Sequence, residues 1–159
     1  MELAPSDVTF DVYDKLAEIP AFDDDVRVAG MPASVVDLGE RLRAANAVMI
    51  AMPEYNYSVP GVLKNALDWA SRVQPSPLAG KALGIMGASP GNYGTARSQY
   101  HLRQIAVFLD MHPINKPEVM VTRAMEKFDA SLKLTDEPTR KVVETFVAAL
   151  RDWSVRITK

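Results

Sequence analysis

The chain has 159 residues, of which 48% are hydrophobic, and a formal net charge of −2. This length predicts a single domain, residues 1–159, because a chain of this size can bury a substantial core. The small net charge gives no overall attraction to nucleic acid or to a membrane surface. Cysteine is absent, which excludes disulfides, thiol chemistry and cysteine-based zinc sites.

No apolar stretch approaches the length that a membrane-spanning helix needs. The first residues have neither the basic flank nor the apolar run of a secretory signal. His101 and His112 have no partner at the spacing of metal ligands, so no metal site is expected. We therefore expect a cytoplasmic protein that binds neither membrane nor metal.

Strands and helices are predicted to alternate along the chain. Residues 8–13 alternate apolar and polar side chains, as a half-buried or edge strand does. Residues 20–30 are expected to form an acidic loop, and Pro32 can occupy the first position of a helix. Residues 47–52 are continuously apolar, which predicts a strand buried on both faces.

The second half of the chain repeats this alternation. We expect helices at 61–73 and 95–110, strands at 82–88 and within 114–121, and a last helix capped by Thr135. Alternating strands and helices imply a parallel sheet covered by helices on both faces, with right-handed crossovers. The predicted fold class is therefore α/β.

The turn after the apolar strand 47–52 is the most informative segment. There a buried strand ends, a polar and aromatic loop opens at its carboxyl end, and a helix returns. In open α/β sheets, ligands bind in that crevice. Tyrosine rings, an amide, a carboxylate and a proline suit a planar heteroaromatic ligand better than a metal or a sugar. The loop contains Pro53, Glu54, Tyr55, Asn56, Tyr57 and Ser58.

A second loop, residues 87–97, follows the next predicted strand with the sequence Gly-Ala-Ser-Pro-Gly-Asn-Tyr-Gly-Thr-Ala-Arg. Glycines there allow close approach of the backbone to a ligand. The loop lacks the Gly-Lys-Ser/Thr ending of a P-loop, and the chain has no dinucleotide-binding fingerprint. Tight binding of NAD(P) is therefore not expected.

Together with residues 99–104 and 115–118, these two loops resemble segments of the NADPH-dependent FMN reductase family. That family comprises flavodoxin-like reductases of quinones, chromate and azo dyes. The resemblance covers roughly residues 8–155 and implies a flavodoxin-like three-layer α/β/α fold with a parallel sheet. The family opens with a strand and a Ser- and Arg-rich loop that holds the FMN phosphate. Neither is visible here, so the first strand and helix of the family are expected to be missing.

If that central strand is missing, residues 8–13 lose their hydrogen-bonding neighbour, which costs about 1–3 kcal/mol for each buried group left unsatisfied. Three outcomes are open: the edge of the sheet rearranges, another chain fills the gap, or the working protein is longer.

The resemblance also implies which residues contact FMN. Pro53, Glu54, Tyr55, Asn56, Tyr57 and Ser58 would lie along one part of the flavin, and Gly87, Ser89, Pro90 and Gly91 along another. NADPH or NADH would be a transient electron donor. No side chain is assigned as a catalytic residue, because the flavin carries the chemistry.

Several alternatives remain open for individual residues. Tyr55 and Tyr57 could simply pack the loop against the next helix. Glu54 could anchor its loop through backbone N–H groups or touch the cofactor, and Ser58 could be a turn hydroxyl or a helix cap. Arg97 and Tyr100 share one helix face, for which exposure to solvent is the simplest reading.

Two functions are open for the whole chain. The first is an FMN-dependent NAD(P)H oxidoreductase that reduces a quinone, free flavin, an azo dye or chromate. The second is a flavodoxin-like interaction module that has lost tight FMN binding. The resemblance suggests a homodimer or homotetramer, with Tyr100 and Glu118 at a subunit interface.

Overall fold

The computed structural model describes residues 1–158 and contains one four-stranded parallel sheet. The central strand β2 (Ala82–Ala88) pairs with β1 (Ala47–Ala51) along one edge. Along its other edge it pairs with β3 (His112–Pro113) and then with β4 (Val119–Val121). Every pairing is parallel, as the alternation of strands and helices predicts.

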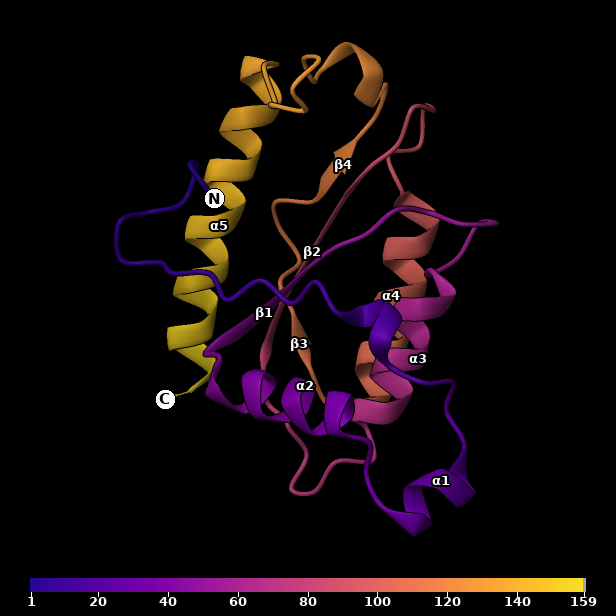
Figure 1. The fold of residues 1–159 in the computed structure, drawn as a ribbon. Helices are drawn as coiled ribbons and strands as arrows, with labels where there is room; N and C mark the ends of the chain where they lie inside the picture. Colours follow the sequence, from indigo (N-terminus) through magenta and orange to yellow (C-terminus); the bar gives the residue numbers. More distant parts are fainter. Residues whose placement is uncertain (159) are drawn as a thin grey trace.

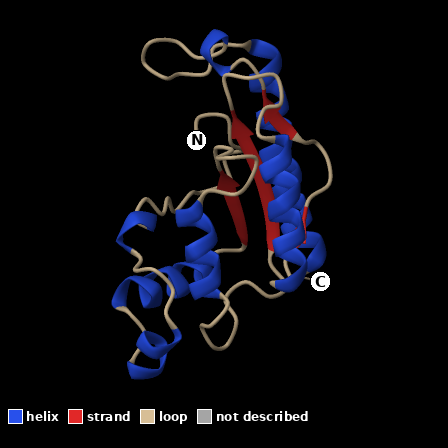
Figure 2. Ribbon diagram, turned by 90° about the vertical axis from the view of Figure 1, so that its right-hand side faces the viewer, coloured by secondary structure: helices blue, strands red, loops and turns tan. Residues whose placement is uncertain are grey.

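Helices cover both faces of the sheet (Figures 1 and 2). The long helix α5 stands on one side of the strands and α3 and α4 on the other (Figure 1). The helices are α1 (Asp24–Ala29), α2 (Ala33–Ala44), α3 (Gly61–Ala70), α4 (Ala96–Phe108) and α5 (Glu137–Ile157), with short 3₁₀ turns η1 (Leu16–Glu18) and η2 (Ala124–Glu126).

Two hydrophobic cores lie on opposite faces of the sheet. Leu83 and Ile85 of β2 join the core that α2, α3 and α4 build. Ala82 joins the core on α5, and Met86 packs against it. Successive side chains of a strand point to opposite faces, so one short strand supplies both cores. This arrangement confirms the predicted α/β class with helices on both faces.

Residues 8–13 do not form the predicted strand. Val8 and Phe10 pack against the core on α5, whereas Tyr13 packs against the opposite core. Figure 1 shows this segment crossing the sheet beside β1. The apolar and polar alternation thus reflects Val8 and Phe10 packing on one core while Thr9 and Asp11 stay exposed, and not strand pairing.

The edge position of β1 corrects a second expectation. Residues 47–50 are only half-buried and Ala51 is exposed, although full burial on both faces was predicted. No strand pairs with the outer side of β1 within residues 1–158. Full burial requires neighbours on both edges, and β1 has one.

Three further boundaries differ from the sequence prediction. The expected acidic loop contains α1, because the Asp23 carboxylate accepts a hydrogen bond from the Asp25 N–H at the helix start. The strand expected within 114–121 is split into β3 and β4. Asp136, rather than Thr135, caps α5 by accepting from the Thr139 N–H. Short strands and caps depend on tertiary contacts that sequence patterns do not contain.

Gly84 is the point of closest approach between β2 and α5. A Cβ built at this position would lie 2.6 Å from Leu150 Cδ2 and 2.9 Å from Phe146 Cζ. We expect Gly84→Ala to lower the free energy of unfolding by about 1–3 kcal/mol, because extra volume in a packed core forces its neighbours to move. Urea unfolding followed by circular dichroism measures the change.

Gly61→Ala is the matched control, because a Cβ at Gly61 meets no atom within 4 Å. It lies in the first turn of α3, where alanine favours the helix. Equal stabilities of the two variants would contradict the packing of α5 on β2.

Candidate functional site

The two predicted loops leave the sheet side by side. Ala51 pairs with Met86 in the register of β1 and β2, and the Met52 N–H then donates to the Met86 carbonyl at 3.0 Å. A Cβ at Gly87 would collide with the Met52 carbonyl oxygen and with Thr95 Oγ1. Glycine is therefore required at this position, and its close approach is to the protein's own atoms.

The first loop contains a tight two-residue turn. The Tyr55 N–H donates to the Ser58 carbonyl at 3.1 Å, and the Ser58 N–H donates to the Tyr55 carbonyl at 3.0 Å. Asn56 and Tyr57 between them have φ of 50° and 65°. Positive φ at both central residues defines a type I′ turn. Tyrosine is rarely left-handed, so the turn holds Tyr57 in a strained and defined position.

Glu54 and Ser58 fasten this loop to helix α4. One Glu54 carboxylate oxygen accepts from the Ser98 N–H at 3.2 Å, in the first turn of the helix, where negative charge is stabilised. Ser58 Oγ lies 3.0 Å from His101 Nδ1, one turn further along. Of the two roles considered for Glu54, the structure shows the anchoring contact with a backbone N–H. Ser58 meets a histidine side chain, which neither of its two predicted roles includes.

The second loop is fastened to the segment after β4. The Ser89 N–H donates to the Val121 carbonyl at 2.9 Å, and the Ala124 N–H donates to the Ser89 carbonyl at 2.9 Å. The Arg123 N–H donates to the Gly91 carbonyl at 3.0 Å. Pro90 and Gly91 are exposed, and a Cβ at Gly91 would meet no atom within 4 Å. Open space therefore lies over Gly91, unlike Gly87.

Arg97 connects the two loops, a contact that sequence analysis missed. Its guanidinium carbon lies 4.1 Å from the ring centre of Tyr57 and 4.1 Å from that of Tyr93. Its Nη1 lies 3.3 Å from Glu54 Oε1. The sequence left the surroundings of Arg97 open, and only the turn at Asn56 brings Tyr57 to it.

Unpaired donors lie on both loops. The backbone N–H groups of Asn56, Tyr57, Gly91 and Asn92 have no hydrogen-bond partner within residues 1–158. Tyr55 and Tyr57 also present exposed rings. Backbone donors, exposed rings and the open space over Gly91 fit the polar edge and flat face of an isoalloxazine ring. Donors for a phosphate would have to come from other residues, since Arg97 is already paired with Glu54.

Tyr100 and Glu118, the suggested interface residues, meet within one chain. The Tyr100 hydroxyl donates to Glu118 Oε1 at 2.9 Å, and Lys116 Nζ lies 3.2 Å from Glu118 Oε2. The hydrogen bond from Tyr100 first, and the one from Lys116 second, hold the pKa of Glu118 below its ordinary value. The pair stays solvent-accessible on the Tyr100 side.

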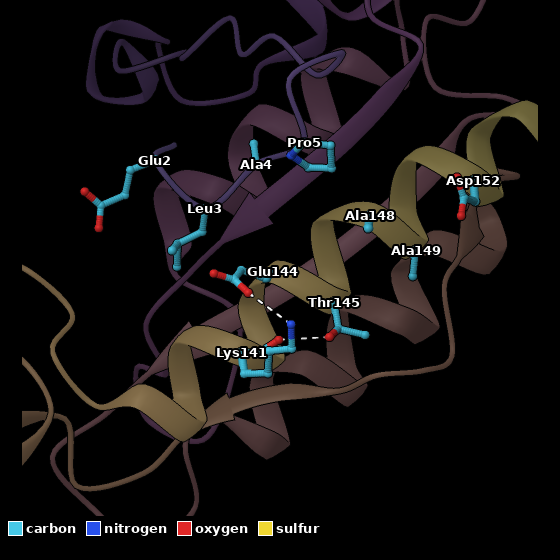
Figure 3. Close-up of a pocket in the computed structure, with 10 residues that line it drawn as sticks. All are labelled: Glu2, Leu3, Ala4, Pro5, Lys141, Glu144, Thr145, Ala148, Ala149 and Asp152. Carbon is cyan, nitrogen blue, oxygen red and sulfur yellow. Dashed lines mark hydrogen bonds and ion pairs between the residues drawn. The ribbon is translucent and has the colours of Figure 1, made fainter.

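The structure contains two hollows, one remote from the two loops and one beside the second loop. A groove of about 610 Å³ runs between residues 2–5 and α5, where Lys141 pairs with Glu144 (Figure 3). A smaller hollow of about 300 Å³ is lined by Ala124, Met125, Phe128, Asp129 and Leu132. Across residues 1–158, no three metal-ligating side chains cluster. No helix in the same residues is long and apolar enough to cross a membrane.

Comparison with known proteins identifies the family and the fold of this chain. The sequence model of NADPH-dependent FMN reductases matches residues 1–126. The NAD(P)H-dependent FMN reductase of Pseudomonas aeruginosa is 48% identical over 155 residues, which cover 98% of this chain and 83% of that protein. The quinone reductase of Escherichia coli K12 is 50% identical over 129 residues, 80% of this chain and 69% of that protein.

A solved structure agrees with these relatives. FerB, a flavoenzyme NAD(P)H:acceptor oxidoreductase from Paracoccus denitrificans, superposes with a TM-score of 0.81 at 34% identity. The superposition covers 89% of this chain and 78% of FerB. The fold is thus the flavodoxin-like α/β class. The chain belongs to the NADPH-dependent FMN reductase family, as the two loops predict.

We expect Tyr100→Phe to raise the pKa of Glu118 toward its ordinary value, because the hydrogen bond that favours the carboxylate is lost. A lowered carboxyl pKa in the folded state adds stability above the unfolded-state pKa, and this stability is lost as the pH falls through the folded-state pKa. The unfolding free energy of the variant should therefore change less with pH in that acidic range. Titration of the Glu118 carboxyl carbon by NMR measures the shift.

Lys116→Gln is the control for the second contact of the same carboxylate. We expect it also to raise the pKa of Glu118, because the hydrogen bond and the charge of Lys116 both favour the carboxylate. An unchanged Glu118 pKa in Tyr100→Phe would show that the Tyr100 contact does not form in solution.

Proposed function

We propose that this chain is an FMN-dependent NAD(P)H oxidoreductase of the quinone-reductase type. The observation that carries the proposal is the meeting of two loops at one edge of the sheet, after β1 and after β2, with exposed rings and free N–H groups on both. Ligands of open α/β sheets bind at the carboxyl ends of the strands. Family membership agrees with this placement.

Residues of both loops would contact the isoalloxazine ring. Tyr55 and the Asn56–Tyr57 turn would lie along one part of it, and Ser89 to Gly91 along another. The N–H groups of Asn56 and Gly91 are available as donors to ring oxygens and nitrogens. Pro53 and Pro90 limit the backbone freedom of their loops. Glu54, Ser58 and Gly87 would act indirectly, because they fasten loop to helix or loop to loop.

The bound flavin would supply the exchange of hydride and electrons between NADPH or NADH and an acceptor. The chain's part is to bind the ring, orient it and present donors toward its polar edge, which favours negative charge there. No side chain of the two loops is assigned as a proton donor or a nucleophile. The site thus works by position and electrostatics.

A quinone is the acceptor that the surroundings favour. Relatives that are 50% and 41% identical carry the names quinone reductase and NAD(P)H:quinone oxidoreductase. The apolar hollow at Met125 and Phe128 adjoins the Ser89 loop, since the Ala124 N–H donates to the Ser89 carbonyl. An apolar surface at this point suits a quinone ring better than a metal oxyanion.

We further propose a homo-oligomer in which α4 packs against α4 of a second copy. Val107 and Phe108 at the end of this helix are 80% and 79% exposed, and Tyr100 is exposed two turns earlier. With His101 and Gln104 they form one stripe, because these positions recur at helical spacing. Apolar side chains in such a stripe favour contact with another protein surface, and its continuity with Tyr100 suits the suggested interface.

FMN binding tests the enzyme proposal. The 159-residue chain should quench the fluorescence of added FMN, and the complex should oxidise NADPH when a quinone is present. Gly91→Val should weaken FMN binding by about tenfold, or roughly 1.4 kcal/mol, because its side chain enters the space for the ring. Its unfolding free energy should stay unchanged, since a Cβ at Gly91 meets no protein atom within 4 Å.

Tyr55→Asp is a second probe, which brings a negative charge to the same ring. Equal FMN affinity in wild type and in both variants would contradict the assignment of the FMN site to these two loops. A chain that neither quenches FMN nor oxidises NADPH would instead favour the flavodoxin-like module without catalysis.

The oligomer proposal predicts that Phe108→Asp lowers the assembly state, because burying a carboxylate in an apolar contact is costly. Sedimentation velocity should show a dimer or tetramer for wild type and a monomer, or a smaller assembly, for the variant. Val28→Asp is the control, since Val28 is 72% exposed on α1, outside the α4 stripe. A monomeric wild-type chain would refute this interface.

A further inference from the structure

The contact between Arg97 and two tyrosines is the tightest cation–ring contact among residues 1–158. The guanidinium carbon lies 4.1 Å from each ring centre, whereas the other three arginine–ring contacts measure 5.6 to 5.7 Å. A cation over a ring is attracted within about 6 Å, and a planar guanidinium can also stack. The Arg97 guanidinium makes such a contact with two rings at once.

The two rings belong to different loops. Tyr57 lies in the turn after β1, and Tyr93 in the loop after β2. They are 66% and 62% exposed, and neither phenol has a hydrogen-bond partner within residues 1–158. Two such rings would otherwise rotate freely in water. The backbone turn sets where Tyr57 lies, and Arg97 is the contact that orients both rings.

The orientation of Arg97 is itself fixed. Its Nη1 pairs with Glu54 Oε1 at 3.3 Å, and the other Glu54 oxygen accepts from the Ser98 N–H at 3.2 Å. The Glu54 side chain is only 11% exposed, so the pair is poorly screened by water. The guanidinium is thus held by the first loop and by the start of α4 while it contacts a ring from each loop.

We propose that Arg97 is a positioning residue that sets the spacing of the two loops before FMN binds. This inference rests on the proposed function, because it assigns the spaced loops to the isoalloxazine ring. When the loops are already ordered before FMN binds, less conformational entropy is lost on binding, so preorganisation raises the affinity. An exposed arginine that only stabilised the fold would leave that affinity unchanged.

The experiment measures FMN affinity and loop order separately in the full chain. Arg97→Ala should raise the dissociation constant of FMN by about tenfold, because the stacking contacts and the preorganisation are both lost. Arg97→Lys should not restore affinity, since an ammonium group keeps the charge but lacks the planar surface. In the FMN-free protein, both variants should lose near-ultraviolet circular dichroism from tyrosine.

Arg156→Ala is the matched control, because Arg156 also lies over an aromatic ring, Trp153, at 5.6 Å on α5. It should bind FMN as wild type does and keep the tyrosine signal. Arg97→Ala and Tyr57→Leu should also be non-additive in FMN affinity, because they remove parts of one contact.

Two results would overturn the inference: unchanged FMN affinity in Arg97→Ala, or full rescue by Arg97→Lys. If the wild type fails to bind FMN, the proposed function fails. The positioning role is then judged on the FMN-free protein, where an unchanged tyrosine signal in Arg97→Ala refutes it.

Discussion

The arrangement of the candidate site depends on one backbone contact, at Gly87. There the last part of β2, the carbonyl of Met52 after β1 and the hydroxyl of Thr95 before α4 approach so closely that no side chain fits. Any larger residue would separate the two loops at their roots. The parallel pairing of β1 with β2 sets their direction, and this glycine allows them to start in contact.

Hydrogen bonds from buried side chains then hold the two loops and helix α4 in place. Glu54 joins the first loop to α4, and Gln99 joins α4 to the sheet, because its amide donates to Thr95 Oγ1 at 3.0 Å and to the Val119 carbonyl at 2.9 Å. Gln99 is fully buried, and all of this pairing is internal. The loops are exposed for a ligand, whereas Gln99 and most of the Glu54 side chain are buried.

The strongest sequence patterns predicted the fold well and the site in part. The apolar run 82–88 has the bounds that the structure shows, and both loops lie where strand ends were expected. The strand predicted at residues 8–13 is wrong, because an extended segment that packs Val8 and Phe10 on one core and exposes Thr9 and Asp11 has the same sequence pattern as an edge strand. The contacts that join the two loops also could not be predicted from the sequence. The positions of Arg97 and Tyr57 depend on a left-handed backbone at Asn56, which a sequence period cannot reveal.

The path of the N-terminal segment has a consequence for how copies of the chain meet. β1 is an edge strand, and an open strand edge can recruit another strand and start aggregation. Phe10 packs on one side of the sheet and Tyr13 on the other, where its hydroxyl also donates to the Ser34 carbonyl at 3.2 Å. The N-terminal segment is therefore anchored on both faces of the sheet, and a second strand that added beside β1 would need room next to a segment that packing already holds in place.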